Sequence, residues 1–252
     1  MKKCIIQKSL IMSYKEIYNM AMPTSKRKEE KLNIWVTFAV RPLSVLLTMA
    51  FIESKTKPTT ITKWSVLACI IGAFFLILSN SVFFSLIGWL FFFMWAVLDG
   101  VDGNLARCTN QCSAIGDLWD TMGGYAAMVL IYFGAGIAAY YDTNRFDFIE
   151  THYNLIMGGA TAIFSIFPRL VMHKKKSSGI ESQAVRSLSE KHNFSILKVL
   201  GMNLISPSGA MQLILLGSIL FHVLNFFIFF YCVVNFVIMI VSLKTLLYEE
   251  LP

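Results

Sequence analysis

Long uncharged stretches dominate the pattern of hydrophobic and polar positions along this chain. Residues 64–98 contain no Lys, Arg, Asp or Glu, and one helix of that length would extend about 52 Å at about 1.5 Å per residue. Because the hydrocarbon core of a membrane is only about 30 Å thick, we predict two transmembrane helices here. They lie near Thr60–Ser79 and Val82–Ala106, with a turn at Asn80-Ser81.

A second uncharged stretch, residues 199–243, is longer still and must also be divided, near residues 222–225. Two single apolar segments, near 115–141 and 154–172, lie between these two pairs. The pattern therefore predicts an all-α fold, a polytopic membrane protein with six transmembrane helices.

Segment 34–53 is also apolar, but it contains Arg41-Pro42. Because Arg and Pro are costly in the middle of a span, we predict an amphipathic helix at the inner interface that precedes the six spans. A seventh span is the alternative. The membrane domain then covers residues 34–248 and follows a basic cytoplasmic segment at 1–33.

Charge and composition agree with this arrangement. The chain is 56% hydrophobic with a mean hydropathy of +0.62, which excludes an ordinary soluble domain. With a cytoplasmic N-terminus, Arg145 is the one basic residue in an outer loop, as the positive-inside rule favours, and both termini are cytoplasmic. The net charge of +7 then indicates contact with anionic membrane lipids and not with nucleic acid. We expect an integral protein of a bacterial inner membrane.

Acidic residues gather where the second span ends and the third begins. Two sets of positions each share a helix face at the spacing i, i+3, i+4, i+7. They are Asp99, Asp102, Gly103 and Ala106 in the second span, and Asp117, Asp120, Thr121 and Gly124 in the third. If the two faces meet, up to four carboxylates converge at the cytoplasmic end of the bundle and repel one another unless a cation lies among them.

This cluster predicts a site for a hard cation and a phosphate. All-oxygen ligands favour Mg²⁺ or Mn²⁺, and two such ions can clamp a pyrophosphate. The forked guanidinium of Arg107 suits a phosphate, and the small residues Gly103 and Ala106 leave room for a nucleotide. Cys108 and Cys112 lie nearby, but they have no further Cys or His beside them and we assign them no chemistry.

The segment DGVDGNLARCTNQCSAIGDLWD resembles the signature of the CDP-alcohol phosphotransferase family, D-x2-D-G-x2-A-R-x8-G-x3-D-x3-D. Seven positions match in residue type and spacing: Asp99, Asp102, Gly103, Ala106, Arg107, Gly116 and Asp120. Upstream, Arg41-Pro42-Leu43-Ser44 and Pro58-Thr59-Thr60-Ile61-Thr62 look like the family's interfacial helix and the entry to its first span. The similarity covers about residues 35 to 243.

The resemblance implies a transferase in phospholipid, glycolipid or polyol-phosphate synthesis. In such an enzyme a hydroxyl acceptor attacks the β-phosphorus of a CDP-linked alcohol donor and CMP leaves. Two divalent ions, Mg²⁺ or Mn²⁺, would be held by Asp99, Asp102 and Asp120. The CDP would lie near Thr62 and the segment Asp102–Arg107, including Gly103 and Ala106. The same resemblance implies a homodimer.

The fourth acidic position of the signature is occupied by Gly124. In the family this residue is thought to deprotonate the acceptor. Asp117, on the same helix face, can take that role beside Asp120; alternatively the acceptor brings its own base, or the metal lowers the pKa of the hydroxyl. A further alternative is a catalytically degenerate member that binds nucleotide or lipid without turnover.

An acceptor phosphate can bind at a helix start that we predict from Ser206-Pro207-Ser208, with help from Arg169, Arg186 or Lys198. Ordinary capping explains the same residues. A cation transporter is a third class of function, but the clustered acids lie at one face and the last three spans carry none, so no continuous pathway is visible.

Overall fold

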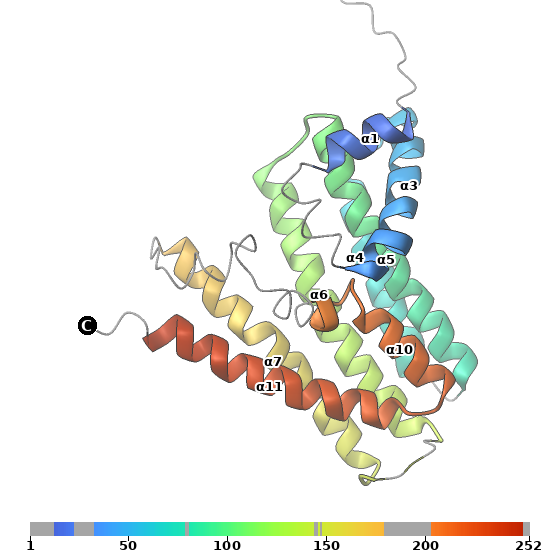
Figure 1. Cartoon of the computed structure of the whole chain (residues 1–252), viewed down its shortest axis with the longest axis vertical. Helices are drawn as coiled ribbons and strands as arrows, with labels where there is room; N and C mark the ends of the chain where they lie inside the picture. The colour runs from blue at the N-terminus through green and yellow to red at the C-terminus, as the bar shows by residue number, and fades with distance from the viewer. Residues whose placement is uncertain are drawn as a thin grey trace, which may run out of the picture.

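The computed structural model describes residues 13–22, 33–78, 81–143, 146, 148–178 and 203–248, and every regular element among them is helical. Figure 1 shows the arrangement of these helices. They are α1 (Tyr14–Ala21), the π-helix η1 (Val36–Val40), α3 (Arg41–Glu53), α4 (Pro58–Ile77), α5 (Val82–Cys108), α6 (Ala114–Tyr141), α7 (His152–Ser177), α10 (Met211–Leu220) and α11 (Leu224–Tyr248). The predicted all-α, polytopic fold is confirmed.

Six helices in the described part of the chain are long and apolar enough to cross a membrane, which confirms the predicted number. One of the six helices is not one of the six that we predicted. The apolar helix over Val36–Glu53 meets the criterion, whereas the predicted fifth span contains the shorter α10, which extends only about 15 Å. Whether residues 34–53 lie at the interface or span the membrane stays a prediction.

The boundaries of the other spans agree closely with the uncharged stretches. The helices α4, α5 and α6 begin and end within two residues of the predicted positions. Helix α7 continues about one turn beyond its predicted end, because Lys174–Lys176 add a polar turn to an apolar span. The predicted division at 222–225 is also observed, since α10 ends at Leu220 and His222 has a positive φ of 56° before α11 begins.

Small residues let the long helices approach closely. Gly72 of α4 faces Gly88 of α5, and a Cβ on Gly88 would lie 2.9 Å from the Gly72 carbonyl oxygen. Gly136 of α6 faces Gly158 of α7, where a Cβ on Gly136 would lie 2.7 Å from the Gly158 Cα. Such small-residue contacts are typical of helix association in membranes.

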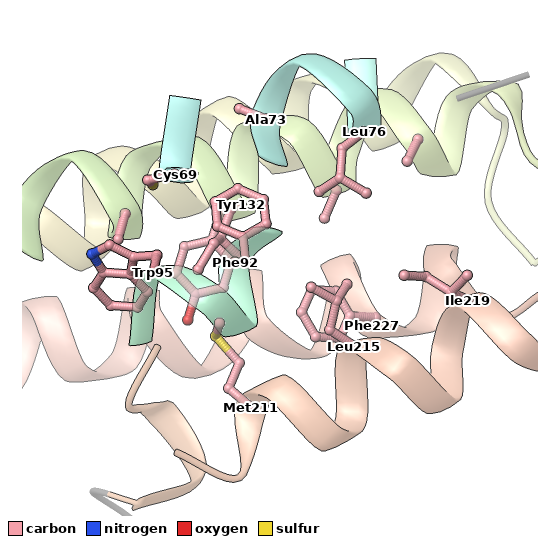
Figure 2. Close-up of a cluster of buried hydrophobic side chains, with 14 of the residues drawn as sticks. Cys69, Ala73, Leu76, Phe92, Trp95, Tyr132, Met211, Leu215, Ile219 and Phe227 are labelled. Carbon is pink, nitrogen blue, oxygen red and sulfur yellow. The ribbon is translucent and has the colours of Figure 1, made fainter. Parts of the chain in front are cut away.

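The buried apolar side chains form a core between the helices. Figure 2 shows part of it, in which Leu76, Phe92 and Tyr132 from three different helices meet residues of α10 and α11. Helix α4 packs extensively against both α5 and α6, whereas α5 and α6 touch each other only sparingly. Near the connection that joins them, α5 and α6 therefore leave space between their side chains.

The N-terminal elements brace this end of α5. Helix α1 packs on α5 and α3, with Ile17 and Ala21 fully buried. The π-helix η1 directly precedes Pro42, and the N–H of Arg41 donates to the Val36 carbonyl. Because Pro42 has no N–H and cannot continue an α-helical ladder, the extra residue of the π-turn is accommodated at this point. The π-turn thereby positions Arg41 against α5.

Candidate functional site

A short, well-capped connection joins the two acidic helices. At the end of α5, Asn110 has a positive φ of 55°, and the N–H of Gln111 donates to the Ala106 carbonyl at 2.9 Å, as in a Schellman motif. Helix α6 then starts at the cap Ser113, whose hydroxyl accepts from the N–H of Gly116 at 3.1 Å. These bonds define the turn between Arg107 and Gly116.

A cavity of about 360 Å³ opens beside this connection. Its walls come from α3, α4, α5, α6 and the connection itself. Every residue that we assigned to the site from the sequence lines it: Thr62, Asp99, Asp102, Gly103, Ala106, Arg107, Asp117 and Asp120. The structure also places Arg41, Pro58, Thr59 and Gly116 there.

Three carboxyl groups face one another across the cavity. Asp99 lies against Asp120 of α6 and close to Asp102 of its own helix. Asp102 is 5% exposed, and its Oδ2 is buried without a hydrogen-bond partner. Thr62 lies beside the Asp102 carboxyl and donates its hydroxyl proton to the Pro58 carbonyl at 3.2 Å. Asp117 also lines the cavity and, like Asp120, is exposed.

Two arginines also line the cavity. Arg107 turns back over Gly103, where an added Cβ would lie 3.2 Å from both of its terminal nitrogens. A side chain at position 103 would therefore press on the guanidinium. The Nε of Arg107 is buried without a partner. Arg41 lines the same cavity from α3; the sequence could have suggested this residue, because an arginine in an apolar segment is costly and indicates function.

A sequence model of the CDP-alcohol phosphatidyltransferase family matches residues 55–248, well over half of the chain. The chain belongs to the CDP-alcohol phosphatidyltransferase family. No curated protein matches it. The matched region contains the carboxylates of the cavity and begins after α3, so Arg41 and the other N-terminal contributions lie outside it.

Members of this family generally depend on a divalent cation. Among the described residues, no three His, Cys, Asp or Glu side chains are grouped as a metal site. The residues present nevertheless suit a hard cation, because Asp99, Asp102 and Asp120 offer only oxygen ligands and one of those oxygens is buried without a partner. Like-charged carboxylates in contact need a proton or a cation between them.

The space beside Gly124 is open. A Cβ built on Gly124 meets no atom within 4 Å. Gly124 and Thr121 do not belong to the cavity wall, whereas Asp117 and Asp120 of the same helix do.

The region expected to bind the acceptor differs from the prediction. Residues 207–210 form a turn in which the N–H of Gly209 donates to the Ser206 carbonyl, and α10 begins only at Met211 without a side-chain cap. The predicted capping role of Ser206 and Ser208 is therefore wrong; their hydroxyls instead contact each other at 3.3 Å. Arg169 of α7 lies near the side chains of Tyr125 and Tyr132. Arg186 and Lys198 lie outside the described residues.

Proposed function

We propose that this protein transfers a phospho-alcohol group from a CDP-alcohol donor to a hydroxyl acceptor and releases CMP. The acceptor oxygen forms a bond to the β-phosphorus while the bond from that phosphorus to the bridging oxygen breaks, and the bridging oxygen leaves with CMP. The observation that carries the proposal is the single cavity in which α4, α5 and α6 gather the family's signature residues.

The carboxylates and the arginine have complementary roles in this proposal. Asp99, Asp102 and Asp120 would hold divalent metal, Mg²⁺ or Mn²⁺, in two ions. Bound metal would neutralise charge on the diphosphate and lower the pKa of the attacking hydroxyl. Arg107 binds the diphosphate of the donor with its forked donors. Gly103 and Ala106 leave space for the donor against the α5 backbone.

The remaining proton must leave the acceptor hydroxyl. Asp117 supports this step, because it lines the same cavity one turn from Asp120 and its side chain is exposed to a substrate. Gly124 supplies no group for it. We therefore place Asp117 as proton acceptor, with Asp120 at the reacting centre.

The acceptor reaches the cavity from the membrane interface. In our proposal the cavity opens to the cytoplasm of a bacterial cell, with both termini on that side, and the protein acts as a homodimer. Arg169, an arginine within α7 near two tyrosines, would attract an acceptor that carries a phosphate. Such an acceptor is consistent with synthesis of a phospholipid, a glycolipid or a polyol phosphate.

The test is CMP release by the purified protein with Mg²⁺ and a panel of CDP-linked lipid and small-alcohol donors. We expect Asp99→Asn to abolish release, and chelation to abolish it reversibly. Asp142→Asn is the matched control, because Asp142 caps the opposite end of α6, away from the cavity. Equal release by the wild type and the Asp99 variant would refute the assignment.

Gly124 favours a second candidate, a protein that binds nucleotide without turnover. This candidate is supported by the absence of a side chain at Gly124 and by the open space around a Cβ built there. For this candidate we expect Mg²⁺-dependent binding of CDP but no CMP from any donor. Release of CMP that depends on Asp117 would exclude it.

A further inference from the structure

One buried amide connects the two arginines of the cavity. Asn104 of α5 is fully buried, and its Oδ1 accepts from Arg41 Nη1 and from Arg107 Nη2, each at 3.1 Å. The two guanidinium groups come from different helices, and they share this acceptor. Both arginines also line the cavity.

Helix α3 fixes the orientation of that amide. The Nδ2 of Asn104 donates to Ser44 Oγ and to Thr48 Oγ1, each at 3.4 Å. Both hydroxyl protons are already used, since Ser44 donates to the Arg41 carbonyl and Thr48 donates to the Ser44 carbonyl. The hydroxyls can only accept, and arginines can only donate, so the amide oxygen must face the arginines.

Close helix packing supports this arrangement. A Cβ on Gly100 would lie 3.1 Å from Ser44 Cβ, so α3 approaches α5 one turn before Asn104. This approach brings Arg41 to the wall of the cavity.

The acceptor that joins the arginines is neutral. A carboxylate at position 104 would cancel much of their positive charge, whereas an amide holds the two groups without adding a negative charge. The cavity also contains a buried donor and a buried acceptor without partners, Arg107 Nε and Asp102 Oδ2. An unpaired buried polar group is costly, and a phosphate beside the arginines would satisfy the donor.

We propose that Asn104 is a positioning residue that holds Arg41 and Arg107 together as a clamp for the diphosphate of a cytidine nucleotide. The inference rests on the proposed function and deepens it, because it adds Arg41 and Asn104 to the donor site. Asn104 acts through the arginines and touches no substrate itself.

Binding of CDP and of CMP to the full-length protein with Mg²⁺ tests the clamp without turnover. We expect Asn104→Asp to raise the Kd for CDP by at least about tenfold. This change corresponds to the loss of roughly one charge-assisted hydrogen bond between an arginine and the diphosphate. The Kd for CMP should change less, because CMP lacks the second phosphate. The ratio of the two dissociation constants should therefore fall.

Asn154→Asp is the matched control. Asn154 of α7 is also a buried amide, 1% exposed, and its Nδ2 donates to the Ala139 carbonyl at 3.3 Å. It does not line the cavity. We expect this variant to lose stability as Asn104→Asp does, but to keep the wild-type ratio of CMP to CDP affinity.

A double-mutant cycle separates positioning from packing. If Asn104 acts through Arg41, the combined Arg41→Ala and Asn104→Ala variant should lose less CDP affinity than the two single losses added together. Ser44→Ala, which removes one acceptor of the Asn104 amide, should weaken CDP binding in the same direction and serves if the Asn104 variants do not fold.

The outcomes distinguish this inference from the proposed function. An unchanged affinity ratio in Asn104→Asp, or additive losses in the cycle, overturns the clamp even if the wild type releases CMP. Wild-type CDP binding without CMP release removes the transferase function but leaves the clamp supported if the ratio falls. A wild-type protein that does not bind CDP overturns both.

Discussion

The contact between α6 and α7 leads to a quantitative prediction from two adjacent glycines. A Cβ on Gly158 would lie 2.8 Å from the Gly136 Cα and 3.0 Å from the Tyr132 carbonyl oxygen. Favourable carbon–carbon separations are about 3.5–4.0 Å. To reach such a separation from 2.8 Å, the two helices must move apart by about 1 Å. A Cβ on Gly159, one residue later on α7, meets no atom within 4 Å.

Substitution of each glycine by alanine isolates the steric part. The two variants gain the same helix propensity, about 1 kcal/mol at most, so that contribution cancels in their difference. Overpacking against backbone atoms costs about 1–3 kcal/mol. We therefore expect Gly158→Ala to have a free energy of unfolding about 1–3 kcal/mol below that of Gly159→Ala.

Reversible unfolding in mixed detergent micelles, followed by circular dichroism, measures this difference. Gly136→Ala should match Gly158→Ala, since each Cβ would enter the same contact from the opposite helix. Equal stability of Gly158→Ala and Gly159→Ala would refute the close approach of α6 and α7.

Three further predictions concern the site and the N-terminus. Gly103→Ala should raise the KM for the donor by up to about tenfold, because its Cβ would lie 3.2 Å from both terminal nitrogens of Arg107 and shift the guanidinium; unchanged kinetics would contradict this geometry. Asn110→Val should lower the free energy of unfolding by about 1–2 kcal/mol, because a left-handed residue tolerates Asn but not Val, whereas Asn110→Gly should be neutral in the same assay. Hydrogen bonds from the Ser13 backbone and hydroxyl lower the pKa of Glu16. Their stabilisation of α1 is present above the ordinary pKa of Glu and is lost as the pH falls through the lowered value; the protection of α1 amides from exchange should then fall on acidification in the wild type but not in Glu16→Gln, which has no carboxyl to titrate.

Much of the fold follows from the length of uncharged stretches. A run such as 64–98 cannot cross a membrane once without leaving apolar turns outside it, so α4 and α5 could be predicted with their boundaries. The ten-residue α10 could not be, because residues 199–221 are uncharged throughout and hydropathy does not reveal where a helix starts. The turn at 207–210 depends on local hydrogen bonds of Ser206 and Gly209.

The carboxylates of the candidate site were predictable from spacing, because i, i+3 and i+4 positions on a helix share a face whatever surrounds them. The contact that joins Arg41 to α5 was not. Arg41 and Asn104 are 63 positions apart, and their contact depends on the close approach of α3 at Gly100 and on the π-turn before Pro42. Periodicity within one helix carries no information about such a contact between helices.

The carboxylates and the arginines of the cavity bear opposite charges, and both line the same space. Asp102 and Arg107 are on the same helix, and a direct ion pair between them would leave both groups satisfied without a ligand. The structure instead leaves one buried atom of each without a hydrogen-bond partner, while Arg107 is held by the neutral oxygen of Asn104. Because unpaired buried polar groups are costly, this separation of charge favours a ligand that carries both signs, such as a nucleotide diphosphate with its divalent cation. An aspartate in place of Asn104 would add a negative charge beside the arginines and weaken the affinity of the cavity for that ligand.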